Sequence, residues 1–199
     1  MNLRRSAGIE SANVAGGTGI GRQVDQPLID RARHGDLDAF ESIIRARMDA
    51  VYRLTVAVLG NDADASDATQ ETFVAVWRQL PSLRDVDRFD AWLQRIAVNA
   101  ARMVLRSQRR RRVREIGASE VPAIEARAAH GELDDASVLD RALRTLSVEQ
   151  RAILVLHHLE GRSVKELATV LEIPVGTAKT RLFAARRALS RALASERWD

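Results

Sequence analysis

The chain has 199 residues, of which 46% are hydrophobic and only 4% aromatic, a composition that supports a core of helices. It contains no cysteine and no apolar run near the roughly 20 residues of a membrane helix, which excludes disulfide chemistry and membrane insertion. The formal net charge is +4, and residues 95–114 carry eight arginines and no acid, which indicates a polyanionic partner. No apolar stretch follows Arg4 and Arg5, so we expect a cytoplasmic protein without a secretory signal.

The first 26 residues contain five glycines among small polar residues, which predicts a disordered tail. Three helices are expected next. Asp36 is a candidate cap for the second, Gly60-Asn61 ends it, and Pro81 ends the third. The expected bounds of the three helices are 27–34, 37–59 and 64–80.

A long helix is predicted from about Arg88 into the arginine tract near Arg114, followed by an acidic segment with scattered Gly and Pro that is typical of a linker. Helical periodicity then resumes at 135–146, 148–159, 163–171 and 174–195. The predicted fold class is all-α, with two small helical domains joined by a flexible linker. The predicted regions are a tail at 1–26, a first domain at 27–114, the linker at 115–134 and a helix-turn-helix domain at 135–199.

Helical spacing also predicts which side chains face the core. For the third and last helices these are Ala68, Phe73, Val76 and Leu80, and Val175, Ala178, Leu182, Ala185 and Leu189. In the long helix, Trp92, Ile96, Asn99 or Ala100, and Met103 share one side.

A helix-turn-helix is the clearest local signal. Ser163 and Glu166 have the spacing of a capping box, Ala168 is small enough for a close helix crossing, and Pro174 suits a first helical position. The opposite face of the second helix carries short polar and cationic side chains, which suit entry into the DNA major groove. The alternative interpretation is an ordinary helical hairpin with a basic surface. The exposed residues on this face are Thr177, Lys179, Thr180, Phe183, Ala184, Arg186 and Arg187.

The predicted helix at 88–114 combines aromatic residues with cations. Aromatic and arginine side chains on one element can stack unpaired bases and hold their backbone. Asn99 is able to donate to and accept from a base edge, and the loop at 83–87 is a candidate wall for an extruded base. From spacing alone, Trp92 fits a core position equally well.

Three sequence blocks resemble the extracytoplasmic-function (ECF) group of sigma factors. Residues 67–78 read DATQETFVAVWR, residues 89–99 read FDAWLQRIAVN, and residues 174–182 read PVGTAKTRL after a Leu-Ser pair at 146–147. Their order and spacing agree with those of the group, and the resemblance covers about residues 27–193. Three ordered blocks are far more specific than the helix-turn-helix alone.

The resemblance implies a transcription initiation factor that binds core RNA polymerase through its beta and beta-prime subunits, recognises the −35 and −10 promoter elements and promotes strand opening. Implied for polymerase binding are Asp67, Gln70, Glu71, Phe73 and Trp77. Implied for the −10 element are Phe89, Trp92, Arg95, Asn99, Arg102 and Arg106. Implied for the −35 element are Ser163, Thr177, Lys179, Thr180, Arg181, Phe183, Arg186 and Arg187.

The resemblance also implies control by an anti-sigma protein, and it implies no cofactor, no metal and no catalytic residue. The acidic linker would run towards the RNA exit path of polymerase. Two positions depart from the group's pattern. Thr69 stands where the group usually has an apolar residue, and Ala184 stands where relatives often carry a cation.

Two alternatives compete with this interpretation. A conventional helix-turn-helix repressor or activator would bind duplex DNA without polymerase, but it leaves the block at 67–78 unexplained. A nuclease or nucleotide hydrolase would need a metal or phosphate site. The His157-His158 pair and the acids Asp62, Asp64 and Asp67 lack the spacing of a metal site, and no Gly-rich phosphate loop is present.

Overall fold

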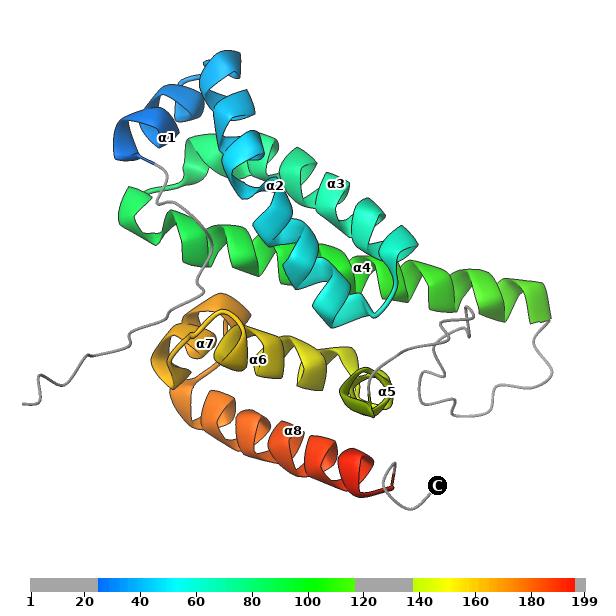
Figure 1. Ribbon diagram of the computed structural model, residues 1–199. Helices are drawn as coiled ribbons and strands as arrows, with labels where there is room; N and C mark the ends of the chain where they lie inside the picture. Colours follow the sequence, from blue (N-terminus) through cyan, green and yellow to red (C-terminus); the bar gives the residue numbers. More distant parts are fainter. Residues whose placement is uncertain (1–24, 117–137, 196–199) are drawn as a thin grey trace, which may run out of the picture.

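The computed structural model describes residues 25–116 and 138–195, and every regular element within them is helical (Figure 1). Eight α-helices and two short 3-10 turns follow one another along these residues. They are α1 (Gln26–Arg33), α2 (Leu37–Leu59), α3 (Asp62–Gln79), η1 (Leu80–Ser82), η2 (Val86–Arg88), α4 (Phe89–Ile116), α5 (Val138–Arg144), α6 (Val148–His158), α7 (Val164–Leu171) and α8 (Val175–Ser195). This confirms the all-α prediction.

Local capping residues set the ends of the first long helices. The Asp36 carboxylate accepts from the Ala39 N–H at 3.0 Å at the start of α2, and Gly60 closes that helix in the left-handed region with φ 79°. The Asn61 side chain then accepts from the Asp64 N–H at 2.8 Å. Because Asn61 caps the next helix, α3 begins at Asp62, two residues before the predicted start.

The helices α2, α3 and α4 pack together as the first domain, and α1 covers the N-terminal end of α2. The predicted buried side of α3 is confirmed, since Ala68, Phe73, Val76 and Leu80 are all buried. The guanidinium of Arg47, fully buried on α2, lies 2.9 Å from the Asp90 carboxylate at the start of α4. This pairing ties α2 to α4 where the long helix begins.

The helices α5 to α8 form the second domain. Residues close in sequence set where the helices of its helix-turn-helix begin and end. Ser163 and Glu166 form the predicted capping box at the start of α7. Glu172 ends α7 in the left-handed region with φ 53°, and α8 follows Pro174. Another capping box, formed by Ser147 and Gln150, starts α6.

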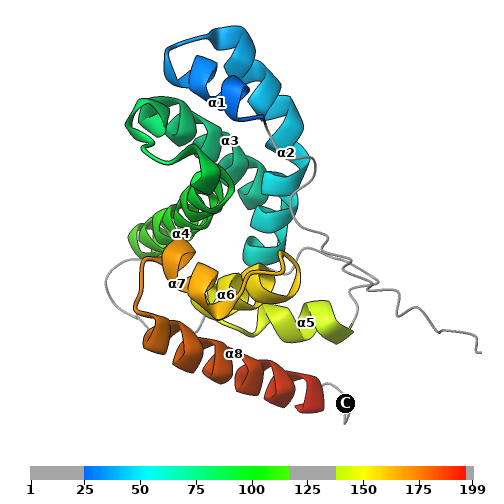
Figure 2. The ribbon, with the colours of Figure 1, turned by 90° about the vertical axis from the view of Figure 1, so that its left-hand side faces the viewer.

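The second domain lies directly against the first. Figures 1 and 2 show α6 and α7 beneath the layer of α2, α3 and α4, with α8 on the outer side. α6 packs on α2, and α7 packs on α4. Buried apolar residues of both halves therefore join into one cluster that runs through the interface.

Several predictions from spacing need correction. Val175 is 51% exposed, so it is not a core residue. The side of α4 grouped by spacing is mixed, since Ile96 and Ala100 are buried whereas Met103 is 67% exposed. α4 also buries Leu93, Ala97 and Ala101, because it packs against α2 and α3 on one side and α7 on another. The helix predicted at 135–146 is described as Val138–Arg144.

The acidic linker predicted at 115–134 lies almost wholly outside the described residues, as does the N-terminal tail at 1–26 apart from its last two positions. The domain boundaries drawn there stay predictions.

Candidate protein-binding and nucleic-acid-binding surfaces

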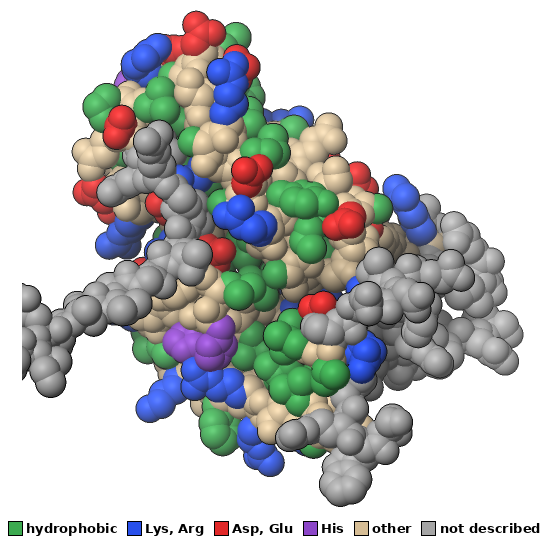
Figure 3. Space-filling view, viewed as in Figure 1, with side chains coloured by type: hydrophobic (Ala, Val, Ile, Leu, Met, Phe, Trp, Pro, Cys, Tyr) green, Lys and Arg blue, Asp and Glu red, His purple; other side chains and the backbone are tan. Residues whose placement is uncertain are grey.

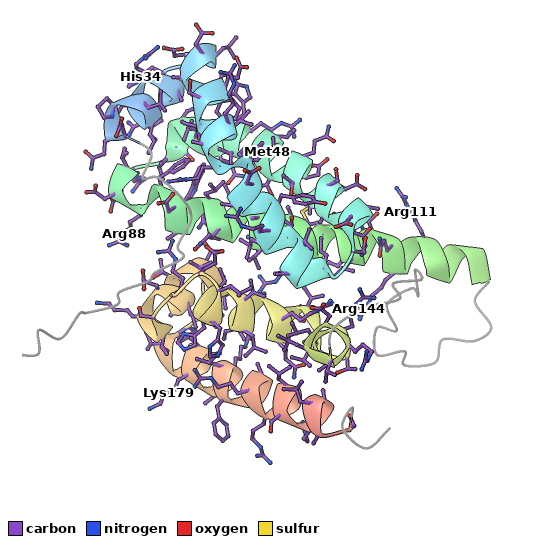
Figure 4. The ribbon with its side chains drawn as sticks, viewed as in Figure 1. His34, Met48, Arg88, Arg111, Arg144 and Lys179 are labelled. Carbon is purple, nitrogen blue, oxygen red and sulfur yellow. The ribbon has the colours of Figure 1, made fainter. Side chains whose placement is uncertain are left out.

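An apolar groove of about 710 Å³ runs between α2 and α3. The rings of Phe40 and Trp77 pack across it, with centroids 4.8 Å apart and planes at 50°. Figure 3 shows apolar side chains exposed over these two helices, and Figure 4 places Met48 on α2 facing α3. The exposed apolar residues of the groove are Leu37, Met48, Val74 and Trp77. Such a surface is the physical signature of a protein-binding site.

The residues predicted to bind polymerase lie on α3, in and beside this groove. Gln70, Phe73 and Trp77 line it, while Asp67 and Glu71 are exposed on the same helix. Phe73 is only 6% exposed, so it supports the groove floor more than it offers contact area. The sequence analysis missed the opposite wall, which α2 supplies: Leu37, Phe40, Ile44, Met48 and Tyr52.

Thr69, which departs from the pattern that the sequence resembles, is buried beneath the groove. Its hydroxyl lies 2.9 Å from that of Thr55, and Thr55 also reaches the carbonyls of Tyr52 and Ala65. The polar substitution is therefore accommodated by hydrogen bonding across the α2–α3 contact, because a buried hydroxyl requires a partner.

The start of α4 divides its two aromatic residues between core and surface. Phe89 is 2% exposed and packs within the core, so in this conformation it has no surface to offer to DNA. Trp92 is half-buried, with its ring centroid 5.9 Å from that of Phe89. One face of Trp92 thus packs on the core while part of the ring remains accessible.

Further along α4, the predicted −10 residues lie at the junction of the two domains. Arg95 pairs with Glu172 at the turn of the helix-turn-helix. Asn99 is exposed, and its side-chain oxygen accepts from Arg102 at 3.1 Å. Arg106 is exposed one turn beyond Arg102.

A cleft of about 840 Å³ separates the second half of α4 from the N-terminus of α6 and the end of α8. Its charged lining consists of Arg102, Arg106, Arg109, Arg191 and a single acid, Glu149. Burial lowers the pKa of Arg102, and the nearby Arg181 and Arg106 lower it further, against an opposing effect of Glu149. Crowding of like charges of this kind favours an anionic ligand.

The predicted −35 residues fall on the outer side of the second domain. Lys179, Thr180, Arg181, Arg186 and Arg187 are exposed on α8. Lys and Arg side chains gather along the lower margin of Figure 3 over this helix, and Figure 4 shows Lys179 pointing away from the body of the protein.

The three remaining members of the predicted −35 set, Ser163, Thr177 and Phe183, make local contacts. Phe183 is 63% exposed, and the Arg187 guanidinium lies 5.9 Å from its ring centroid. The Thr180 hydroxyl donates to the Thr177 carbonyl at 3.0 Å. The Ser163 hydroxyl is used in the capping box of α7, donating to Glu166 at 2.7 Å.

The described residues contain no group of three or more His, Cys, Asp or Glu side chains able to hold a metal ion. The rings of His157 and His158 meet edge to face at 4.7 Å, and His157 Nδ1 lies 2.7 Å from the Arg162 carbonyl. Burial, His157 and Arg186 together lower the pKa of His158. No helix of the described part is long and apolar enough to cross a membrane.

Comparison with known proteins identifies the family of this chain. The family models described as Sigma-70 region 2 and Sigma-70, region 4 match residues 43–111 and 137–189. The chain is 33% identical over 180 residues to the ECF RNA polymerase sigma-E factor of Salmonella typhimurium, an alignment that spans 83% of this chain and 92% of the relative. The chain belongs to the ECF sigma factors.

Other relatives agree with this assignment. The sigma factor is 32% identical over 187 residues to the RNA polymerase sigma-H factor of Pseudomonas aeruginosa, over 86% of its own length and 95% of the relative's. Among solved structures it resembles CnrH in complex with the cytosolic domain of CnrY, with a TM-score of 0.60, 27% identity, and 87% and 99% of the two chains covered. It also resembles the sigma factor RpoE of Bartonella quintana in complex with the anti-sigma factor NepR, with a TM-score of 0.58, 28% identity, and 79% and 98% covered.

Proposed function

We propose that this sigma factor binds core RNA polymerase through the α2–α3 groove, recognises the −35 and −10 promoter elements with α8 and α4, and opens the DNA strands without catalysing any reaction itself. The observation that carries the proposal is the presence of three separate surfaces, one apolar and two cationic, in a chain of the ECF family.

Polymerase binding is assigned to the groove because its chemistry suits a helical partner. Apolar residues at its centre provide contact area, while Gln70 and Glu71 at its edge provide hydrogen bonds. An interface of this type gains most of its affinity from a few buried aromatic or aliphatic anchors. Trp77, paired with Phe40, is the aromatic candidate.

Recognition of the −10 element is assigned to Trp92 and Asn99, with the loop at 83–89 beside them. Their accessible parts offer a stacking surface and a base-reading amide. Arg102 and Arg106 then supply positive charge to hold the backbone of the opened strand. Trapping of unpaired bases offsets the few kcal/mol that unstacking costs.

Recognition of the −35 element is assigned to the exposed face of α8. Its first turns carry Lys179 and Thr180, and the cationic pair Arg186 and Arg187 follows two turns later. The N-terminal residues of a recognition helix reach base edges in the major groove, whereas later cations contact phosphates. Ser163 contributes to this surface by fixing the start of α7, since its hydroxyl is used in the cap.

Control by an anti-sigma partner belongs to the same proposal. Two relatives were solved as complexes, CnrH with the cytosolic domain of CnrY and RpoE with the anti-sigma factor NepR. The α2–α3 groove is an apolar surface that such a partner would cover in competition with polymerase.

The separate assignment of polymerase binding to α3 and of strand opening to α4 is tested with two double variants. Each is compared in binding and open-complex assays with bacterial core polymerase. Gln70→Ala/Glu71→Ala should lose polymerase binding, while Trp92→Ala/Asn99→Ala should keep polymerase binding and lose open complex, measured by permanganate reactivity of unpaired thymines. An exchange of these two outcomes would overturn the assignment.

A further inference from the structure

The cleft between α4, α6 and α8, which we call the arginine cleft, carries more positive charge than the proposed promoter contacts use. Its charged lining consists of Arg102, Arg106 and Arg109 of α4, Arg191 of α8 and a single acid, Glu149. Its volume of about 840 Å³ lies within the range of small-molecule sites, which enclose about 300–1,000 Å³. Arg109 and Arg191 belong to neither promoter surface, so their place in the cleft needs another explanation.

The four arginines of the cleft lack a counter-charge within the described part of the protein. Arginines elsewhere are paired, as Arg47 is with Asp90, but none of these four forms an ion pair with another described residue. Arg102 donates to Asn99 through one terminal nitrogen, while its Nε is shielded from solvent and has no partner among these residues. Because a partly buried cation without a partner is costly, an anion in the cleft would be stabilising.

The N-terminus of α6 faces the same cleft and adds hydrogen-bond donors. The capping box of this helix uses the N–H groups of Ser147 and Gln150, which lie 3.0 and 3.3 Å from their acceptors. The next two N–H groups, of Val148 and Glu149, have no acceptor within the helix, and both residues line the cleft. Unpaired N–H groups together with the helix dipole favour a phosphate at this position.

The rest of the lining is aliphatic, which favours a free nucleotide over a DNA strand. Leu105, Val148 and Ala188 are half-buried on the walls of the cleft. An apolar surface beside a group of cations suits a ligand with a phosphate chain and a base. Grooves for single-stranded nucleic acid have aromatic side chains on which successive bases stack, and no residue that lines this cleft is aromatic. One compact ligand therefore fits the lining better than an extended strand.

We propose that the arginine cleft binds one nucleoside polyphosphate, a class represented by ATP and GTP. The four arginines and the N-terminus of α6 hold the phosphate chain, and the base packs on the aliphatic lining. Because Arg102 and Arg106 are also assigned to the opened strand, a bound nucleotide competes with DNA for these two cations. The competition rests on the function proposed above, whereas nucleotide binding itself does not.

Binding to the full-length protein, without polymerase or DNA, tests the site directly. Isothermal titration calorimetry with ATP and with GTP should show one site per chain with a dissociation constant below about 1 mM. Inorganic tripolyphosphate carries the phosphates without a base, so it should bind at least about tenfold more weakly. Absence of saturable binding for both nucleotides, or equal affinity for tripolyphosphate, would overturn the proposal.

Removal of cations from opposite walls of the cleft locates the bound nucleotide. Arg109→Ala/Arg191→Ala should weaken ATP binding at least about tenfold, because two charged contacts are lost. Arg45→Ala/Arg53→Ala removes two exposed cations of α2 outside the cleft, and it should change the affinity less than about twofold, because charges that distant are screened. Equal weakening in the two double variants would show a general effect of net charge and would overturn the site.

Removal of the single acid should have the opposite effect. Glu149 is exposed in the first turn of α6, and Glu149→Gln removes its charge while keeping the shape of the side chain. ATP binding should become at least about threefold tighter. Glu41→Gln, on the exposed side of α2, is the matched control and should leave the affinity unchanged. Since loss of folding cannot tighten binding, an unchanged or weaker affinity in Glu149→Gln would contradict the proposal.

Competition with single-stranded DNA tests the consequence for promoter opening. ATP should weaken binding of a −10 oligonucleotide to the free protein, measured by fluorescence anisotropy. Arg191→Ala, outside the −10 surface, should bind the oligonucleotide normally but require more ATP for the same competition. An oligonucleotide affinity that ATP does not change would overturn the competition. Failure of the oligonucleotide to bind even without ATP would instead contradict the proposed −10 role, while calorimetry would still decide the nucleotide site.

Discussion

Single polar side chains determine where several helices of this protein begin. At the start of α7, the Glu166 carboxylate accepts from the Ser163 hydroxyl at 2.7 Å, the Ser163 N–H at 2.9 Å and the Arg162 guanidinium at 3.0 Å. These bonds hold the pKa of Glu166 below its ordinary value of 4.5, with the Ser163 hydroxyl contributing most. The cap that positions the helix-turn-helix is therefore strongest when Glu166 is ionised.

The stability of the second domain should accordingly depend on pH through Glu166. A depressed carboxyl pKa adds stability above the unfolded-state value near 4.5, and this stability is lost as pH falls through the folded-state pKa. Glu166→Gln should flatten the fall in free energy of unfolding below pH 5, measured by urea denaturation. Ser163→Ala, which removes the largest cause, should flatten it in the same direction. An unchanged slope in both variants would contradict this account of the cap.

Lys179 is the residue whose exposure and position most favour direct DNA contact. It points away from the protein near the N-terminus of α8. We expect Lys179→Ala to weaken binding of a −35 duplex about tenfold and to reduce the salt slope by about 1, since one cationic contact is lost. Fluorescence anisotropy over a salt series measures both quantities. Arg53→Ala, an exposed cation of α2, should leave them unchanged.

Predictions for single residues were incomplete where a helix faces more than one neighbour. Spacing grouped the exposed Met103 with the buried Ile96 on one side of α4 and left the position of Trp92 undecided, because periodicity identifies one apolar stripe and α4 has two buried sides. Phe89 was grouped with the DNA-binding residues from the motif that it begins; it is buried in this structure, and its DNA-binding role stays a prediction. Only the tertiary contacts of α4 distinguish these cases.

Helix ends are the element-scale feature that the sequence specified best. Gly60 closes α2 with φ 79°, and a Cβ there would meet the Arg151 guanidinium at 3.0 Å. Gly60→Ala should therefore destabilise the protein by about 1 kcal/mol or more, through backbone strain and a shifted Arg151.

Gly176 provides a matched control, because substitution to alanine there should raise the stability of the protein and not lower it. It lies in α8 with no heavy atom within 4 Å of an added Cβ. Gly176→Ala should stabilise the protein by about 0.4–1 kcal/mol, because the unfolded chain loses freedom and the helix loses nothing. Thermal denaturation of both variants checks the pair, and equal shifts in one direction would contradict the role given to Gly60.

The α2–α3 groove is an element-scale surface whose second wall could not be predicted. The motif at 67–78 identified α3, but the contribution of α2 depends on how the two helices pack. Met48 is 40% exposed on that second wall. Met48→Asp should lower polymerase affinity at least about tenfold, since a charge replaces an apolar contact.

Leu159→Asp provides the control for this experiment. Leu159 is 58% exposed at the end of α6, outside the groove, so polymerase affinity should not change. Surface plasmon resonance with immobilised core polymerase measures both variants. Equal losses would indicate a general effect of added negative charge and would contradict the groove assignment.

At the scale of the whole molecule, the two helical domains were predictable, but their mutual packing was not. Family motifs and helix caps are local in sequence, whereas the side chain of Gln94 on α4 is hydrogen-bonded to Glu160 and Arg162, which are 66 and 68 positions away. No periodic pattern marks such a glutamine as buried. The packing of the two domains against each other follows only from the three-dimensional structure.

Promoter-directed transcription is the property that the whole molecule is proposed to confer. Run-off transcription with purified bacterial core polymerase, on a library of promoter sequences, measures it with and without the protein. We expect defined transcripts only when the protein is present, from templates that share a −35 and a −10 element. Absence of protein-dependent transcripts, together with no association between the protein and core polymerase, would contradict the account.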